Sequence, residues 1–150
     1  MSRSKRMQPV VRVAEDRERQ AARALGEAQR RLAENESKLA ELIGYREQYS
    51  QSFNTAGGVG LDARRLHDYR VFLERLGTAI SQQSELVEQL RLDCERSRRR
   101  WLETRTRAQA LDKVTERYQQ VERKAEERLE QHDSDERALR TRRKPSHEDH

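Results

Sequence analysis

The chain has 150 residues, of which 33% are hydrophobic and 39% are charged, and its net charge is +5. So few hydrophobic residues exclude an ordinary globular domain with a large core; they leave a disordered chain or long helices with a narrow apolar stripe. The 32 basic and 27 acidic residues are mixed along the sequence, which is typical of a solvent-facing helix surface. A single cysteine, and no apolar run of the ~18–20 residues that span a bilayer, favour a cytoplasmic protein.

The first predicted element is a helix over residues 9–54, preceded by a flexible N-terminus at 1–8. Apolar side chains recur in a seven-residue repeat, which predicts a coiled coil. Most seam positions are apolar: the first position of the repeat holds Val11, Glu18, Leu25, Leu32, Leu39, Arg46 and Phe53, and the fourth holds Ala14, Ala21, Ala28, Asn35, Leu42 and Tyr49. Pro9 is expected in the first turn, where a missing N–H group costs nothing.

A glycine turn at 55–61 follows, because Gly57, Gly58 and Gly60 interrupt a sequence that is otherwise helix-forming. A second helix is predicted over residues 62–140, with Asp62 as its N-cap. The heptad pattern restarts there. Its first positions hold Leu66, Leu73, Ile80, Val87, Cys94, Trp101, Ala108, Thr115, Glu122 and Leu129, and its fourth positions hold Tyr69, Leu76, Gln83, Leu90, Ser97, Thr104, Leu111, Tyr118, Ala125 and His132. Residues 141–150 are expected to be a disordered tail.

The predicted fold is therefore all-α: a long antiparallel two-helix coiled coil, or helical hairpin, with the second helix overhanging. Centring the hairpin on Gly57 and Gly58 pairs Tyr49 with Leu66 and leaves residues 107–140 without an intramolecular partner. An isolated helix of that length is marginal in water. The overhang is either a frayed segment or a helix completed by another protein.

Beside the seam near the turn, positions normally occupied by charges hold Tyr45, Phe72 and Ala79. These side chains either thicken a thin core or form a docking patch for a partner.

No chemistry of an enzyme is visible in the sequence. The stretch TAGGVGLDA lacks the Lys-Ser/Thr of a phosphate-binding loop, and His67, His132, His147 and His150 are scattered without metal-ligand spacing. Two helices offer no cleft for a substrate. We expect no enzymatic activity, no cofactor and no metal site. The basic runs RSRRRW and RTRRKP could touch phosphate, but a solvated helix face is favoured and no nucleic-acid partner is expected.

Three stretches carry a resemblance to a known family: VVRVAEDRERQAARALGEAQRRLAENESKLAELIGYREQY, LDARRLHDYRVFLERLGTAISQQ after the glycine turn, and RRRWLETRTRAQALDKVTER. Together they resemble the FliJ family of flagellar type III export proteins over about residues 10–136. The resemblance implies a small antiparallel coiled coil similar to the central stalk of rotary ATPases. It also implies three partners: the flagellar export ATPase hexamer, the cytoplasmic linker of the export gate, and export chaperones. The chain would lie in the cytoplasm at the flagellar base, touching the inner membrane only through partners.

The resemblance also assigns two surfaces. The family's gate-binding patch is matched by Leu42, Tyr45, Tyr49, Phe72, Leu76 and Ala79, whereas Gln83 stands where the family has a histidine. The stalk analogy assigns an ATPase-engaging end to Val11, Arg17, Arg100, Trp101, Arg107, Leu111, Val114, Tyr118 and Val121.

Two alternatives stay open. The chain could be a general chaperone or scaffold that holds secreted subunits, which stimulation of the ATPase would distinguish. Less favoured is a nucleic-acid-binding coiled coil, which predicts a steep salt dependence of duplex binding.

Overall fold

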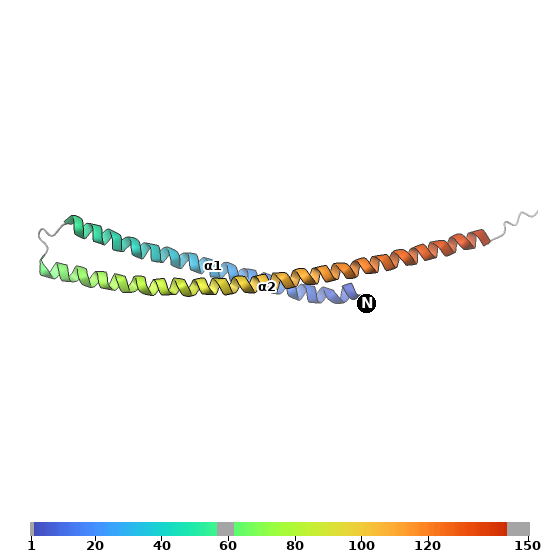
Figure 1. The fold of residues 1–150 in the computed structure, drawn as a ribbon, viewed down its shortest axis with the longest axis horizontal. Coiled ribbons are helices and arrows are strands. Elements are labelled where there is room, and N and C mark those ends of the chain that lie inside the picture. Colours follow the sequence, from blue (N-terminus) through green and yellow to red (C-terminus); the bar gives the residue numbers. More distant parts are fainter. Residues whose placement is uncertain (1, 57–61, 144–150) are drawn as a thin grey trace, which may run out of the picture. The chain divides into compact units, whose positions relative to one another are not determined.

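A computed structural model describes residues 2–56 and 62–143, which form two helices (Figure 1). Helix α1 is Arg3–Ala56 and helix α2 is Ala63–Arg143. Within the described ranges only Ser2 and Asp62 are not helical, and no strand is present. The predicted all-α hairpin is confirmed. Residues 57–61 of the predicted glycine turn and residues 144–150 of the predicted tail lie outside the described residues.

Helix α2 begins where its capping residue predicts. The Asp62 Oδ1 atom accepts a hydrogen bond of 2.9 Å from the Arg65 backbone N–H, and the Asp62 carbonyl accepts one of 3.2 Å from the Leu66 N–H. A carboxylate three residues ahead of the N–H that it accepts from is the usual N-cap geometry. Asp62 is therefore the N-cap of α2.

Helix α1 begins six residues earlier than predicted, at Arg3 rather than Pro9, and Pro9 lies inside the helix. A proline there cannot donate to the carbonyl four residues back, which costs roughly 3 kcal/mol in a helix interior. Contacts at the N-terminus favour the longer helix. The Ser2 Oγ atom accepts from the Lys5 N–H at 3.3 Å, so Ser2 is an N-cap, and Ser4 is held by α2.

The hairpin consists of two compact units. The turn unit is Arg19–Glu103, and the terminal unit is Met1–Glu18 with Thr104–His150, of which residues 2–18 and 104–143 are described. Each unit contains one stretch of α1 packed against one stretch of α2. No described helix combines the length and the apolar character that a membrane crossing would need.

The core of the turn unit follows the predicted heptads. Its buried hydrophobic side chains all occupy first or fourth positions: Ala21, Leu25, Leu76, Ile80, Val87 and Leu90. A polar layer interrupts this core where the Gln83 Nε2 group donates to both the backbone oxygen and the Oδ1 atom of Asn35, each at 3.0 Å. The heptad pattern therefore predicts which side chains are buried in this unit.

The register of the turn unit differs from the prediction by about one heptad. Tyr49 was expected opposite Leu66, but its ring lies 4.6 Å from that of Phe72, and the Phe53 ring stacks on Tyr69 at 4.0 Å. A shift of seven residues keeps the same seam positions facing each other, so the repeat itself does not choose between the two registers. The two aromatic pairs favour the observed one.

The terminal unit corrects the predicted overhang. Ala14 of α1 and Ala108 of α2 are both 5% exposed, and Ser4 of α1 reaches Glu122 of α2. Residues 107–122 of α2 therefore have an intramolecular partner. From residue 123 to residue 143 every side chain is exposed. The overhang exists, but it begins after Glu122 because α1 starts earlier and the register is shifted.

Candidate partner-binding surfaces

Four aromatic side chains of the turn unit form two ring pairs between the helices. Phe53 and Tyr69 stack with their ring planes 10° apart, and Tyr49 and Phe72 meet at a tilt of 44°. The Tyr69 hydroxyl donates to the backbone carbonyl of Tyr49 at 3.3 Å. A tilted ring pair such as Tyr49 and Phe72 adds about 0.5–1.5 kcal/mol to the free energy of apolar burial. The rings are therefore held in place before any partner arrives.

Two of these rings, Tyr49 and Phe72, face solvent together with the nearby Tyr45. Tyr45 is 53% exposed, Tyr49 47% and Phe72 40%. We call these three residues the aromatic patch. Large aromatic side chains half-exposed beside one another are typical of protein-binding sites.

Some of the gate-binding residues expected from the resemblance are exposed, and others are buried between the helices. Tyr49 and Phe72 are brought into contact and, with Tyr45, are accessible. Leu42 and Ala79 are half-buried, and Leu76 is 8% exposed and belongs to the core. The ring partner of Phe72 is Tyr49, and Tyr45 lies one turn away from Tyr49 on α1. Phe53 and Tyr69, which support the patch, were expected only as seam residues.

Gln83 lies about a quarter of the way along α2 and is half-buried. Both of its recorded hydrogen bonds go to Asn35, whose own side-chain amide donates to the Arg31 carbonyl at 2.7 Å. The amide of Gln83 is therefore engaged within the protein and sets the polar layer between the two helices.

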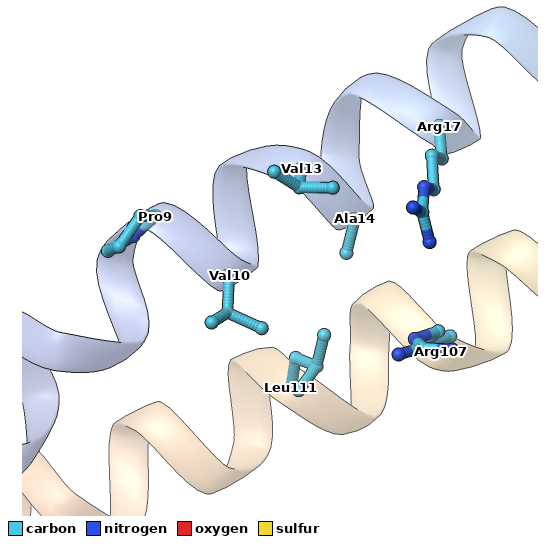
Figure 2. A pocket seen from close by; sticks show the side chains of 7 residues that line it. All are labelled: Pro9, Val10, Val13, Ala14, Arg17, Arg107 and Leu111. Carbon is cyan, nitrogen blue, oxygen red and sulfur yellow. The ribbon is translucent and has the colours of Figure 1, made fainter.

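A groove lies between the helices in the terminal unit (Figure 2). It has a volume of about 370 Å³ and an apolar floor. Its lining residues are Pro9, Val10, Val13, Ala14 and Arg17 from α1, and Arg107 and Leu111 from α2. Figure 2 shows Val10 and Leu111 pointing toward each other, with Arg17 and Arg107 together at the other end.

The groove combines exposed apolar side chains with unpaired positive charge. Val10 is 44% exposed and Val13 is 50% exposed. Arg17 and Arg107 are exposed, and among the described residues neither guanidinium pairs with a carboxylate. Elsewhere arginines do find partners; Arg91, for example, reaches Glu36 at 3.6 Å. The groove therefore presents an apolar surface with two free guanidinium groups at one end.

The N-terminal clasp (Arg3, Ser4, Tyr118 and Glu122) holds α1 against α2 beyond the groove. The Glu122 carboxylate accepts hydrogen bonds from the Ser4 hydroxyl at 2.6 Å and from the Ser4 backbone N–H at 3.1 Å. These bonds hold the pKa of Glu122 below its ordinary value of 4.5, the hydroxyl contributing most. The Arg3 guanidinium lies 5.8 Å from the centre of the Tyr118 ring. Glu122 also supplies the negative charge that the first turn of α1 lacks.

The ATPase-engaging residues expected from the stalk analogy fall in different places. Arg17, Arg107 and Leu111 line the groove, and Tyr118 belongs to the clasp. Val11 and Val114 are half-buried, and Val121 is 66% exposed. Arg100 and Trp101 lie in the turn unit. The analogy missed Pro9, Val10 and Val13. The sequence does contain a signal for an apolar surface there, because the run from residue 10 to residue 13 has three valines where the seam needs one apolar side chain.

A histidine and two carboxylates come together on the overhang. His132, Asp133 and Glu136 have their ligand atoms within 4.8 Å of one another, and the His132 Nδ1 atom lies 3.8 Å from the Glu136 Oε1 atom. One turn of helix therefore brings two carboxylates beside His132, although the histidines alone are not spaced as metal ligands. All three side chains are exposed, and such groups are common on solvated helix faces without an ion.

Comparison with known proteins finds relatives that match most of the chain. A family model described as flagellar FliJ protein matches residues 3–146. The chain is 33% identical over 128 residues to the flagellar FliJ protein of Escherichia coli (strain K12), a match that covers 85% of this chain and 87% of the relative. It is 32% identical over 120 residues to the flagellar FliJ protein of Salmonella typhi, covering 80% and 82%. The similarity thus includes both units.

Proposed function

Because the chain belongs to the flagellar FliJ family, we propose that it is a non-catalytic component of the flagellar protein export apparatus that connects the export ATPase to the export gate. In this proposal the aromatic patch of the turn unit contacts the cytoplasmic part of the gate. The terminal unit contacts the ATPase hexamer. Escort of export chaperones is part of the same role.

The observation that supports this role most is the exposure of the aromatic patch. Tyr45, Tyr49 and Phe72 keep 40–53% of their surface in solvent although the unit has a narrow apolar core that could use them. Exposed aromatic side chains carry much of the binding free energy in protein interfaces. Within the patch, Tyr49 and Phe72 contact each other, and Tyr69, stacked on Phe53, donates a hydrogen bond to the Tyr49 carbonyl. These contacts hold the two rings in place, which lowers the entropy cost of binding.

A non-catalytic role also fits the arrangement of the charged side chains. The carboxylate with a lowered pKa, Glu122, is occupied by Ser4 in the clasp. The described residues that line the groove of the terminal unit are apolar apart from two arginines, and none of them is a carboxylate, a histidine or a thiol. General acid–base chemistry needs a proton donor or acceptor next to a bound substrate. These surfaces are suited to binding rather than to catalysis.

Tyr45 is the best single probe of the gate contact, because its ring is the most exposed of the three and it makes none of the recorded ring contacts. We expect Tyr45→Ala to weaken binding to the purified cytoplasmic part of the export gate by roughly tenfold, as an aromatic hot spot does. Isothermal titration calorimetry measures the affinity.

Leu92→Ala is the matched control for this experiment, since Leu92 is 51% exposed in the same unit but outside the patch. It should change the affinity less than about twofold, in line with most interface-distant surface changes. Equal affinities of Tyr45→Ala and the unchanged protein would remove the aromatic patch from the proposed gate contact.

A further inference from the structure

The groove of the terminal unit has the features of a site for one further helix. Its α1 side is formed by Val10, Val13, Ala14 and Arg17, which are spaced i, i+3, i+4 and i+7 and so lie along one face over two turns. Its α2 side adds Arg107 and Leu111, one turn apart. A groove between two parallel or antiparallel helices accepts the apolar face of a third, anchored at the same spacings.

The distribution of charge indicates which helix fits. The apolar side chains occupy one end of the groove, and the two guanidinium groups without carboxylate partners occupy the other (Figure 2). Val13 and Arg17 are four residues apart, or about 6 Å along the helix axis. An incoming helix would match both if it carried a large apolar side chain and a carboxylate about one turn apart. Paired guanidinium and carboxylate groups form the stronger, charge-assisted class of hydrogen bond.

We propose that this groove binds an acidic amphipathic helix of a partner protein, which places an apolar side chain against Val10, Val13 and Leu111 and a carboxylate between Arg17 and Arg107. The occupant does not come from residues 144–150 of the same chain. These residues follow a helix that continues from Leu111 to Arg143, about 48 Å at 1.5 Å per residue. Seven extended residues reach back only about 25 Å.

The inference deepens the proposed function, and it rests on that function only for the identity of the protein that supplies the helix. The clasp lies just beyond the groove and keeps α1 beside α2 along residues 107–122. The two walls of the groove are thus held together in the free protein, which lowers the cost of binding.

The direct test uses two synthetic alanine-rich helical peptides that carry one leucine and, four residues later, either glutamate or lysine. The full-length protein is labelled for methyl NMR. We expect the glutamate peptide to shift the methyl signals of Val10, Val13 and Leu111 in a saturable way and the lysine peptide to leave them unchanged. Equal shifts from both peptides, or no saturable shift from either, would overturn the inference.

Charge reversal tests the two arginines. The double variant Arg17→Glu/Arg107→Glu should weaken binding of the glutamate peptide at least tenfold. Its control is Arg12→Glu/Arg117→Glu, which changes one exposed arginine on each helix of the same unit outside the groove and has the same net charge. The control should bind within about twofold of the unchanged protein. An equal loss in both double variants would show a diffuse charge effect and overturn the inference.

Binding of the purified export ATPase to the same variants separates the inference from the proposed function. Loss of ATPase binding in the groove variant alone supports both. An ATPase that does not bind the unchanged protein, together with a positive peptide result, overturns the proposed partner and leaves the groove assignment intact. Sedimentation of the unchanged protein as a dimer that dissociates in Arg17→Glu/Arg107→Glu would assign the groove to a second copy of this chain and overturn the proposal.

Discussion

Glu122 and Ser4 show how one pair of side chains changes the extent of a helix. The Glu122 carboxylate accepts two hydrogen bonds from Ser4, and Ser4 is 8% exposed although it lies in the first turn of α1. Acceptance from both a hydroxyl and a backbone N–H favours the ionised carboxylate, so the pKa of Glu122 is lowered. The N-terminal turn is therefore linked to the protonation state of one side chain.

The sign of that linkage predicts how the clasp responds to pH. A folded-state pKa below the ordinary 4.5 means that the clasp is fully stabilised above that value and loses this stabilisation as pH falls through the lowered pKa. The Ser4 amide signal in NMR should titrate with a midpoint below 4.5 between neutral and strongly acidic pH. The transition should vanish in Glu122→Gln and persist in Glu126→Gln, which changes an exposed neighbour. A midpoint at or above 4.5 would contradict the assignment.

Two leucines of α2 that are two positions apart, Leu90 and Leu92, provide a test of which side chains form the buried seam. Leu90 is 5% exposed at a heptad seam position, and Leu92 is 51% exposed. We expect Leu90→Ala to lower the free energy of unfolding by about 2 kcal/mol, the lower end for buried leucines because a two-helix seam can relax around the change. Leu92→Ala should change it by less than about 0.5 kcal/mol. Urea unfolding followed by circular dichroism measures both, and equal losses would refute the seam assignment.

At the scale of the element, the sequence predicts which face of each helix is buried better than it predicts the register between the two helices. The repeat of apolar residues identifies Leu25, Val87 and Leu90 as buried, because only one stripe of each helix can face the other. The same repeat is unchanged by a slip of seven residues. The choice of register depends on pairs such as Phe53 with Tyr69, whose stacking becomes visible only once the two helices are placed together.

The N-terminal boundary of α1 was missed for a related reason. Pro9 is a sound local signal for a helix start, since its backbone nitrogen has no hydrogen to donate. The residues that favour an earlier start lie far away in the sequence, because Ser4 and Glu122 are separated by 118 positions. Local patterns carry no information about such a contact. The site residues Val10 and Val13 lie inside the predicted helix and were missed for another reason, because neither occupies a seam position of the repeat.

The polar layer of Asn35 and Gln83 is a further element-scale feature. A buried polar pair in a seam is less stabilising than an apolar pair, but it penalises registers in which either amide would face apolar side chains. Both hydrogen bonds from Gln83 to Asn35 are 3.0 Å long. The observed register accommodates both this layer and the two aromatic pairs.

At the scale of the whole molecule, stability should come from the paired stretches of the two helices alone. Residues 123–143 are helical but wholly exposed, with Leu129 at 65% and Leu139 at 51%. Deleting residues 126–150 should therefore leave the urea midpoint unchanged and the free energy of unfolding within about 0.5 kcal/mol. The helical signal in circular dichroism should fall in proportion to the residues removed. A lower midpoint would show that the overhang packs on the rest of the chain.

The clasp also determines when the chain can finish folding. Phe53 and Tyr69 are close in sequence, so their contact needs only a short loop to close, whereas Ser4 must wait until residue 122 has been synthesised. The entropy of loop closure grows with length, but each layer formed from the turn outward shortens the next loop. We expect the helices to join progressively from the turn toward the termini during synthesis. The N-terminus, made first, would then be the last segment to reach its native place, and the first to leave it when the protein unfolds.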